Sequence, residues 1–523
     1  MNNLFDLIDT VDIVSFDLFD TLVLRPFIKP QDVFLYLEHS SNIKNFAQNR
    51  ISAEKKARIL NMAKFKKEDC TIDDIYNLME DNFQFLKNIE LNFEKQILVL
   101  NKKMFEVFNY VLTKNKKVVI STDTYLPKKF IEEILSKHSI KNYDSIFVSS
   151  ELGISKASGN LFDSILKKYD VMPEKVLHIG DNEVSDIKNA KKKNIKTFYN
   201  KPKILSFFED ENNKRLISFV KENEKNPIVS SLIGQRIVNF ETEKDYWVNL
   251  GFNYGGILAI GLSLNALEVA KQKDLTDLFF IARDAFFPEE IFSKLNTETG
   301  IKSHYIVLNR VLKNKYDKMP KDENNELFKY LSKIKTNGNR IGIVDTSAGT
   351  FSAQSILQYY LPNKKFVGIY LHTRKNNVYA YKNLSGLILE DVGKMFNLNF
   401  IEILLTSLEP KIEDINDCKP IYETDENKYE IEKRNLYKKI LNGERKFVEQ
   451  YIELFNGYYV VPEIAILYTY ISNFWKNLID EDKKNLSNIK NSVDTQQTMY
   501  VSLVNDKQDI AIQLRQRLLA KKY

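Results

Sequence analysis

Short apolar runs alternate with helical stretches in the first part of the chain. The runs are residues 13–16, 118–120, 145–148 and 176–179. Such short, fully apolar runs are typical of strands that are buried in the middle of a parallel sheet. Helical spacing occupies the segments between them, including residues 128–137 and 161–169. Strands that alternate with helices predict right-handed crossovers and a doubly wound parallel sheet.

A long helical insertion separates the first of these strands from the second. Residues 27–111 keep helical spacing, as in AQNRISAEKKARIL and LNFEKQILVLNKKMFEVFNYVL. We therefore expect a helical cap on a sheet domain that spans residues 1–205. Residues 206–245 are rich in lysine, glutamate and asparagine and also have helical spacing, which predicts a helical connector.

A second alternating region begins near Leu278. The segments LFFIARDAFFPEEIF, HYIVLNR, RIGIVDTSAGTFSAQSIL and KKFVGIYLHT each contain an apolar strand pattern. After Phe396 the pattern is largely helical to the end. The fold class predicted for the chain is therefore α/β with two doubly wound parallel-sheet domains. The second domain is expected to span residues 246–523, with a helical extension over about 397–523.

The composition agrees with two globular domains and excludes several classes of protein. A chain of 523 residues is too long for one hydrophobic core, and 43% hydrophobic residues exclude a disordered chain. The 76 basic and 70 acidic residues give a net charge of only +6, so nucleic acid is not an expected partner. Cys70 and Cys418 lie far apart, which fits a reducing compartment and excludes a cysteine zinc site.

Three segments bear on the location of the protein. Residues 251–267 are the most apolar stretch, but Asn253 and Asn265 lie within it, so a buried helix is predicted rather than a membrane span. The N-terminal residues MNNLFDLIDTVD lack a secretory signal pattern, and a cytoplasmic protein is expected. The basic tail, residues 515–522, suits either peripheral contact with an anionic inner membrane or a plain solvated surface.

Polar residues follow the apolar runs of the first half. They are Asp17, Thr21, Thr122, Asp123, Lys156, Asp181 and Asp186. The carboxyl ends of parallel strands share one edge of a sheet, so we expect these side chains to lie together. One carboxylate can attack phosphorus, a hydroxyl and a lysine can hold phosphoryl oxygens, and other carboxylates can bind Mg²⁺. The sequence therefore predicts a Mg²⁺-dependent phosphoryl-transfer site.

The order of these residues resembles that of the haloacid dehalogenase-like superfamily, over residues 1–205. That family places a cap, here a helical C1-type cap, between its first and second motifs. The resemblance implies that Asp17 is the nucleophile and Lys156 the third-motif lysine. It implies that Thr122 supplies the second-motif hydroxyl, with Ser121 as the alternative. The Mg²⁺ ligands that it implies are Asp17, the backbone oxygen of Phe19, Asp181 and Asp186.

One position departs from the pattern of the phosphatases in that family. They carry a second aspartate two residues after the nucleophile, as general acid and base, and here that residue is Phe19. Asp20 lies one place later and is the candidate replacement. Dehalogenases of the family also lack the second aspartate. Three interpretations therefore stay open: a phosphatase, a dehalogenase or other non-phosphatase enzyme, and an inactive domain retained as a scaffold.

A second candidate site follows the apolar strand in IGIVDTSAGT. Asp345 ends the predicted strand, a loop of small and hydroxylated residues follows, and a helix is predicted from Phe351. Backbone N–H groups and hydroxyls at a helix N-terminus bind anions. The predicted anion-binding residues are Thr346, Ser347, Ala348, Gly349 and Thr350.

This pattern resembles the loop of phosphoribosyltransferases that binds 5-phosphoribosyl-1-pyrophosphate (PRPP). In that family one or two acids hold the ribose hydroxyls, and a basic loop after an earlier strand grips pyrophosphate. The resemblance implies that Asp345 is a catalytic acid at the ribose, although Thr346 replaces the second acid. It implies that Arg283 binds pyrophosphate and that Asp284 contacts Mg²⁺ or the acceptor, the alternative being a local ion pair. Arg310 is a further candidate cation.

Together the two halves resemble bifunctional β-ribofuranosyltransferases of bacterial capsule and O-antigen assembly. The resemblance implies that the C-terminal half transfers ribose 5-phosphate from PRPP to a hydroxyl of a lipid-linked glycan. The N-terminal half then removes the 5-phosphate. Two alternatives remain: a phosphatase whose C-terminal half only positions the substrate, and a non-enzymatic scaffold of a polysaccharide assembly complex.

Two smaller features leave alternatives open. VVISTDTYLPKKFI (118–131) and FFIARDAFFPEEIF (279–292) align without gaps, which indicates either a duplicated domain or two ordinary strand–loop–helix units. Glu402 and Glu409, in FIEILLTSLEP, either face the acceptor or end a solvated helix.

Overall fold

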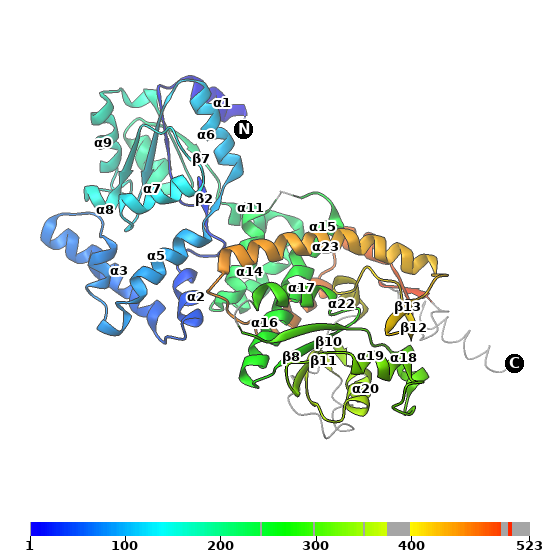
Figure 1. Cartoon of the computed structure of the whole chain (residues 1–523). Coiled ribbons are helices and arrows are strands. Elements are labelled where there is room, and N and C mark those ends of the chain that lie inside the picture. The colour runs from blue at the N-terminus through cyan, green and yellow to red at the C-terminus, as the bar shows by residue number, and fades with distance from the viewer. Residues whose placement is uncertain are drawn as a thin grey trace. The chain divides into compact units, whose positions relative to one another are not determined.

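Figure 1 shows the computed structural model of the chain, which describes residues 2–240, 243–296, 299–348, 351–373, 398–492 and 500–504. The chain divides into two compact units. Unit 1 consists of Met1–Thr242 and Leu454–Val460, and unit 2 consists of Glu243–Glu453 and Val461–Tyr523.

Unit 1 is built on a five-stranded parallel sheet with the order β5-β4-β1-β6-β7. Its strands are β1 (Ile13–Phe16), β4 (Lys117–Thr122), β5 (Ser145–Val148), β6 (Val176–Gly180) and β7 (Lys196–Tyr199). The chain first moves outward from β1 through β4 and β5, and then returns to the other side of β1 with β6 and β7. This change of direction is where open α/β sheets place their ligands, at the carboxyl ends of the strands.

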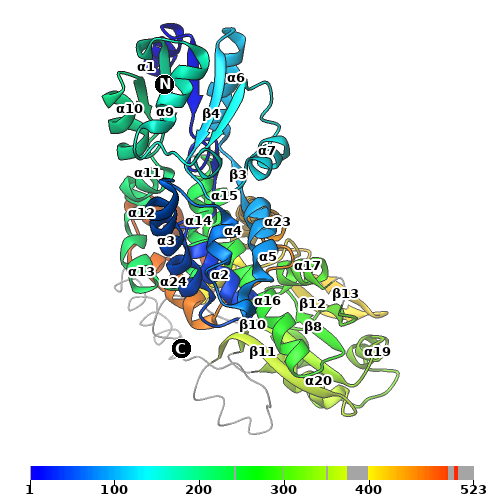
Figure 2. The same ribbon diagram turned by 90° about the vertical axis from the view of Figure 1, so that its left-hand side faces the viewer.

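Helices cover this sheet and complete its core. The apolar side of α9 contributes Leu161, Phe162 and Ile165, which pack with Ile13 and Val119 of the sheet. Figure 2 shows α6 beside β4, and the two elements are in contact. The helices of this part are α1 (Asn2–Asp9), α6 (Lys102–Thr113), α7 (Lys128–Lys137), α8 (Ser149–Leu152), α9 (Asn160–Tyr169), η2 (Pro173–Lys175), η3 (Glu183–Lys188) and α10 (Asn189–Lys192).

The cap lies between β1 and β4 in the sequence. Its helices are α2 (Asp32–Ser40), α3 (Phe46–Phe65), α4 (Ile72–Tyr76), η1 (Asp81–Phe83) and α5 (Leu86–Ile97). The buried guanidinium of Arg50 on α3 forms an ion pair of 2.8 Å with Glu90 on α5, which ties the two helices together. A two-stranded antiparallel ribbon of β2 (Val23–Leu24) and β3 (Val99–Leu100) joins the cap to the sheet. The expectation of helix throughout 27–111 is therefore wrong at β3, whose short apolar run also fits a helix.

Two later segments of the chain also pack within unit 1. The helices that follow the sheet are α11 (Lys203–Glu209), α12 (Glu211–Lys214), α13 (Leu216–Glu222) and α14 (Pro227–Val238). Gly234 of α14 lies so close to the backbone that a Cβ would stand 2.2 Å from the carbonyl carbon of Pro26, so only glycine fits there. Phe455 contacts the rings of Phe27, Tyr36 and Phe93 at 5.0–6.2 Å between centroids.

Unit 2 contains a four-stranded parallel sheet with the order β11-β10-β8-β9. Its strands are β8 (Asp277–Ile281), β9 (Lys302–Ile306), β10 (Arg340–Ala348) and β11 (Lys365–Thr373). The chain moves from β8 to β9 on one side and then crosses to β10 and β11 on the other, so its direction changes between β8 and β10. The helices around this sheet are α17 (Phe286–Leu295), α18 (Arg310–Tyr316), α19 (Glu326–Ser332) and α20 (Ser352–Tyr360).

The strand orders do not separate the two explanations of the internal sequence similarity. β4 lies beside β5 and β8 lies beside β9, so each aligned segment is the neighbour of the strand that follows it. Without β1 the first sheet would have the order β5-β4-β6-β7, which corresponds to β9-β8-β10-β11 in the second. A duplicated domain whose second copy lacks the first strand and two ordinary strand–loop–helix units both agree with these orders.

The remainder of unit 2 is mainly helical. Its elements are α15 (Tyr246–Leu250), η4 (Gly251–Gly255), α16 (Gly256–Gln272), α22 (Leu398–Leu404), β12 (Ile412–Asn416), β13 (Lys419–Tyr422), α23 (Lys428–Phe455), α24 (Ile464–Lys476), α25 (Asp480–Ser487), β14 (Lys490–Ser492) and β15 (Tyr500–Ser502). The prediction of two doubly wound parallel sheets, a capped first domain and a helical extension of the second is confirmed. The basic tail, residues 515–522, lies outside the described residues.

One helical stretch among the described residues has the length and composition to cross a membrane. It spans Tyr246–Gln272, and 83% of its most apolar window is buried inside the structure. Gly251 and Gly255 let it approach α23 closely, because a Cβ at either residue would come within 2.1 Å of an α23 atom. These contacts are those of a buried helix, the alternative that the sequence favoured.

Candidate active site

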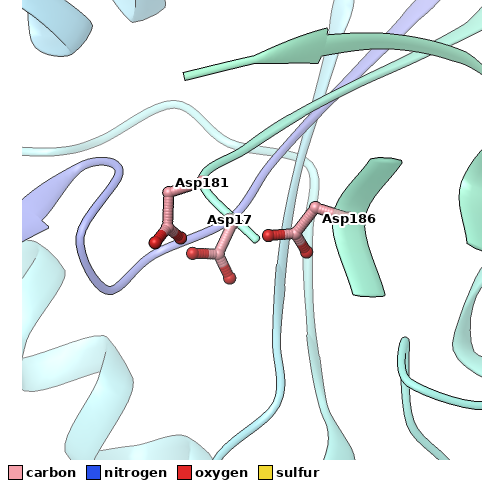
Figure 3. Close-up of side chains that lie close together, drawn as sticks. All are labelled: Asp17, Asp181 and Asp186. Carbon is pink, nitrogen blue, oxygen red and sulfur yellow. The ribbon is translucent and has the colours of Figure 1, made fainter. Parts of the chain in front are cut away.

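Three aspartates meet at the point of unit 1 where the direction of the sheet changes (Figure 3). Asp17 follows β1, and its backbone N–H donates to the carbonyl oxygen of Ile179 on β6 at 2.8 Å. Asp181 and Asp186 follow β6. Carboxylate oxygens of the three aspartates lie within 4.8 Å of one another. The spacing of oxygen ligands is suited to a divalent cation such as Mg²⁺.

Lys156 neutralises part of this acidic cluster. Its Nζ lies 2.5 Å from Oδ1 of Asp17 and 2.6 Å from Oδ1 of Asp186, and its side chain is only 3% exposed. Asp123, after β4, fixes the lysine loop by accepting the backbone N–H groups of Lys156 and Ala157 at 2.9 and 3.1 Å. Asp123 is therefore a positioning residue. The sequence predicted that it lies near the site but did not predict this role.

A buried histidine supports the cluster from within the sheet. His178 Nε2 lies 3.2 Å from Oδ1 of Asp186, and His178 Nδ1 lies 3.1 Å from the hydroxyl of Ser15. Ser15 in turn bonds to the hydroxyl of Ser121 at 2.8 Å. Ser121 is thus engaged inside the sheet, whereas Thr122 is the last residue of β4. Burial lowers the pKa of His178, so the ring is neutral at neutral pH.

The electrostatics of the three aspartates show a shortage of positive charge. Burial, opposed by Lys156, raises the pKa of Asp17 well above its usual value. Burial and the charge of Asp20 raise the pKa of Asp181 to about 7. Burial would raise the pKa of Asp186 too, but Lys156 and His178 outweigh it and lower that pKa. One lysine therefore does not balance three carboxylates, and a divalent cation would complete the balance.

Phe19 and Asp20 stand between Asp17 and the ribbon that leads to the cap. The Phe19 ring lies under the guanidinium of Arg25, with 4.1 Å from the guanidinium carbon to the ring centroid. Arg25 also pairs with Glu94 at 2.6 Å. Asp20 has a φ of +57°, which turns the backbone sharply after Phe19. The charge of Asp20 raises the pKa of Asp181, so the Asp20 carboxyl group is near enough to act on the acidic cluster.

Thr21 also lies at this turn. Its side-chain oxygen is buried, and within the described part of the chain it has no hydrogen-bond partner. A buried hydroxyl without a partner is costly, so a ligand oxygen is a fitting partner for it.

Comparison with known proteins agrees with this geometry. The sequence profile of the haloacid dehalogenase-like hydrolases matches residues 41–199. Unit 1 contains a hydrolase domain of the haloacid dehalogenase type. The matched residues include Thr122, Lys156, Asp181 and Asp186, and Asp17 lies before them. No protein in the curated set matched the chain.

Solved structures of the same type are similar to the hydrolase domain. One is L-2-haloacid dehalogenase from Xanthobacter autotrophicus, with 13% identity over 36% of this chain and 76% of that chain, and a TM-score of 0.28. Another is a haloacid dehalogenase-type phosphatase from Thermococcus onnurineus, with 16% identity over 36% of this chain and 86% of that chain, and a TM-score of 0.27.

Outside the hydrolase domain, a second group of charged residues gathers where the sheet of unit 2 changes direction. Asp284 follows β8, and its Oδ2 accepts the hydroxyl of Thr346 on β10 at 2.7 Å. Burial raises the pKa of Asp284, although the hydrogen bond from Thr346 and the charges of Arg283 and Lys433 oppose the rise. The structure therefore brings together Arg283, Asp284 and Thr346, which the sequence had placed in one site.

Glu402 of α22 joins this group. Burial and the charge of Asp284 raise the pKa of Glu402 to about 7, although solvent reaches its side chain. The cations that oppose this rise are Lys433, Arg283 and Arg310. We call this group the Asp284 site, and its members are Arg283, Asp284, Arg310, Thr346, Glu402 and Lys433. No pattern in the sequence points to Lys433, which lies in the long helix α23.

Three expectations for the second half need correction or completion. β10 continues to Ala348, so the strand does not end at Asp345 and the loop does not begin at Thr346. Ser347 and Ala348 therefore belong to the strand, because the ladder to β11 continues through Ala348. Gly349 and Thr350 lie outside the described residues. Asp345 is opposite Tyr370 of β11 and, after burial, is the cause that raises the pKa of Tyr370.

Glu409 has a structural role and is not a member of the Asp284 site. It accepts the hydroxyls of Tyr305 and Tyr422 at 3.0 and 3.2 Å. Tyr305 belongs to β9 and Tyr422 to β13, so Glu409 joins the parallel sheet to the small hairpin.

Proposed function

We propose that the hydrolase domain removes phosphate from a phosphate monoester through an aspartyl-phosphate at Asp17. The observation that carries this proposal is the cluster of three carboxylates at the carboxyl edge of the sheet, two of which contact one buried lysine. Mg²⁺ would be held by Asp17, Asp181, Asp186 and the backbone oxygen of Phe19. When bound, it supplies positive charge against the phosphoryl oxygens.

The side chains divide the reaction between them. An Asp17 oxygen attacks phosphorus, an O–P bond forms, and the ester P–O bond breaks with its electron pair leaving on the alcohol oxygen. Lys156, which already lies 2.5 Å from Asp17, offsets the charge of the phosphoryl group. The hydroxyl of Thr21, which has no hydrogen-bond partner among the described residues, and that of Thr122 at the end of β4 are the groups that we assign to its oxygens. Water then attacks phosphorus of the aspartyl-phosphate, releases phosphate and restores the Asp17 carboxylate.

We assign Asp20 as the general acid and base of this reaction. Phe19 cannot donate a proton, and the guanidinium of Arg25 packs over its ring. The turn at Asp20 brings the next carboxyl group beside Asp181, and burial raises the pKa of Asp20. A carboxyl group that retains its proton to higher pH can protonate the leaving oxygen and then deprotonate the attacking water.

Phosphate release from ribose 5-phosphate and from para-nitrophenyl phosphate tests this proposal. We expect turnover with Mg²⁺, loss of turnover with a chelator, and recovery when Mg²⁺ is added back. Release of halide from 2-haloacids, with no release of phosphate, would instead identify a dehalogenase.

The second candidate function is ribosyl transfer at the Asp284 site. We infer that unit 2 transfers ribose 5-phosphate from PRPP to a hydroxyl of a lipid-linked glycan, as a step in capsule or O-antigen synthesis. The specific support is that three cations, Arg283, Arg310 and Lys433, share one site with Asp284 at the change of direction in the sheet. Cations at such a position suit a pyrophosphate group.

The chemistry of this transfer matches the mixed charges of the Asp284 site. The glycan hydroxyl oxygen bonds to C1 of the ribose, and the bond from C1 to pyrophosphate breaks with its electron pair leaving on pyrophosphate. Arg283, Arg310 and Lys433 can hold the leaving pyrophosphate, while Glu402, with its pKa of about 7, can accept the hydroxyl proton. The product carries a 5-phosphate, which is the type of ester that we assign to the hydrolase domain.

Binding of PRPP, measured by calorimetry with Mg²⁺ present, tests the second candidate. We expect binding to the wild-type chain and its loss in Arg283→Ala, with Lys302→Ala as an exposed control from the same sheet. A chain that does not bind PRPP but hydrolyses phosphate esters would be a phosphatase with a non-catalytic second unit. A chain that neither binds PRPP nor hydrolyses phosphate esters would be a scaffold. Its peripheral contact with the inner membrane would then be the next property to measure.

A further inference from the structure

The outer surface of α3 in the cap combines exposed apolar side chains with lysines. Ile59, Leu60, Met62 and Phe65 are exposed by 68, 38, 45 and 65%, respectively. The lysines among them are exposed as well, and they are Lys55, Lys56, Lys64 and Lys66. We call these eight residues the α3 patch. Ile59, Met62 and Phe65 follow one another at a spacing of three residues, so they lie along one side of the helix, and exposed apolar side chains of this kind indicate an interaction site.

The inner side of α3 explains why these residues are not needed in the core of the cap. Ala53 and Ala57 are buried at a spacing of four residues, and Arg50 one turn earlier pairs with Glu90. Small side chains and a buried ion pair therefore hold the helix in place. Ile59 and Met62 lie three residues apart on a different side of α3, where 68 and 45% of their surface is exposed to solvent.

The helix that carries the α3 patch is positively charged. From Asn45 to Lys67 inclusive the sequence contains seven basic residues and a single acid, Glu54. Two acids, Glu68 and Asp69, follow directly, and Asp69 pairs with Arg58. Glu54 already pairs with Arg50 and Arg58. No ion pair connects Lys55, Lys56, Lys64 or Lys66 with an acid elsewhere in the described ranges. The surface thus offers apolar side chains surrounded by unbalanced positive charge.

We propose that the α3 patch docks the protein on an anionic lipid surface. Lysines can contact phosphate headgroups while their stems lie along the interface, and Ile59, Met62 and Phe65 can enter the boundary of the acyl chains. A second copy of the chain fits less well, because a twofold contact would bring the same lysines against one another. The proposal is independent of both functions proposed above, and it uses none of the residues of either site.

Co-sedimentation with lipid vesicles tests the proposal on the full chain. Vesicles of phosphatidylcholine mixed with phosphatidylglycerol are compared with vesicles of phosphatidylcholine alone. We expect binding to the mixed vesicles only, and weaker binding as salt is added. Ile59→Ser combined with Phe65→Ser should weaken binding by at least about tenfold. Lys55→Gln, Lys56→Gln and Lys66→Gln together should weaken it by about a hundredfold, since each lysine contributes about fivefold.

Matched control variants distinguish the α3 patch from a general effect of charge or apolar surface. Met172→Ser with Leu205→Ser removes two other exposed apolar side chains of unit 1. Lys102→Gln, Lys103→Gln and Lys141→Gln remove three other exposed lysines. Both controls should bind vesicles as the wild type does, and all variants should release phosphate and melt like the wild type. The proposal is overturned if the wild type does not bind the mixed vesicles, or if the α3 variants bind as tightly as the controls. It is also overturned if the wild type is a dimer or captures a protein partner through the α3 patch and does not bind lipid.

Discussion

Unit 1 and unit 2 each gather charged side chains where the direction of a parallel sheet changes, but the balance of charge differs. In unit 1 one lysine contacts two of three clustered carboxylates, whose oxygens lie within 4.8 Å of one another. In the Asp284 site two carboxylates are accompanied by three cations. We propose that the first site holds a phosphate through a bound cation, whereas the cations of the second site hold an anion directly. In this proposal the side chains, and not the position in the sheet, decide which ligand binds.

The sharpest way to break this comparison is to disable one site and measure the other. Asp17→Asn removes the attacking carboxylate, so phosphate release should fall on the order of 10³-fold or more. PRPP binding should remain unchanged in the same variant. Arg283→Ala should show the reverse, with PRPP binding lost and phosphate release intact. Phosphate release and calorimetry on both variants provide the measurement.

Asp163→Asn is a suitable control for the first variant, because Asp163 is exposed on α9 and, among the described residues, its ion pair is with Lys193 at the surface. It should leave both measurements unchanged. If Arg283→Ala stops phosphate release, the two sites do not act separately.

A smaller effect is expected at the residue that we assign as general acid. Asp20→Asn should lower phosphate release from ribose 5-phosphate by about 10²–10⁴-fold, because the alkoxide then leaves without a proton. The loss should be much smaller with para-nitrophenyl phosphate, since nitrophenolate leaves readily as an anion. Equal losses with both substrates would argue that Asp20 only maintains the shape of the turn.

The raised pKa of Asp181 leads to a prediction about the pH dependence of metal binding. The pKa of Asp181 without metal is about 7, so a bound cation must displace its proton below that pH. Mg²⁺ affinity should therefore fall by up to about tenfold for each pH unit below 7 and should be nearly constant above it. Calorimetric titrations at several pH values test this. An unchanged slope in Asp181→Asn would assign the proton to another group.

The smallest effect concerns the stability of unit 2. The pKa of Glu402 is raised from 4.5 to about 7 in the folded chain, so the folded state binds more protons than the unfolded state between these values. The contribution of Glu402 to the free energy of unfolding is therefore present at low pH and lost as pH rises through 7. Glu402→Gln should match the wild type at pH 5 and be slightly more stable at pH 8 in urea unfolding.

Glu413→Gln, an exposed substitution on β12, should not change this pH dependence. A Glu402→Gln chain that is less stable than the wild type at both pH values would contradict the cluster of charges assigned to the Asp284 site.

The fold and much of the first site were predictable from the sequence, because short local patterns of apolar and polar residues determine them. Apolar runs that end in Asp17 and Thr122 place both residues at the carboxyl ends of strands, whatever the rest of the chain does. The role of Asp123 was not predictable, since it depends on how the Lys156 loop approaches β4. The use of Ser121 inside the sheet likewise depends on the side chains of the neighbouring strand.

The second site was less predictable because it draws on distant helices. Glu402 and Lys433 come from α22 and α23, and no local pattern relates either helix to the end of β8. The continuation of β10 to Ala348 was also missed, since small hydroxylated residues fit a loop as well as a strand paired with β11. Phe455 illustrates the same limit, because its packing against Phe27 joins residues from opposite ends of the sequence.

The most direct test of the account is to trap the covalent intermediate at Asp17. The wild-type chain is mixed with ribose 5-phosphate and Mg²⁺, quenched in acid during turnover, digested and examined by mass spectrometry. We predict one phosphoryl group on the peptide that contains Asp17, and none on that peptide from the Asp17→Asn chain. Steady release of phosphate without any phosphoryl group on that peptide, or a phosphoryl group at another residue, would contradict the account.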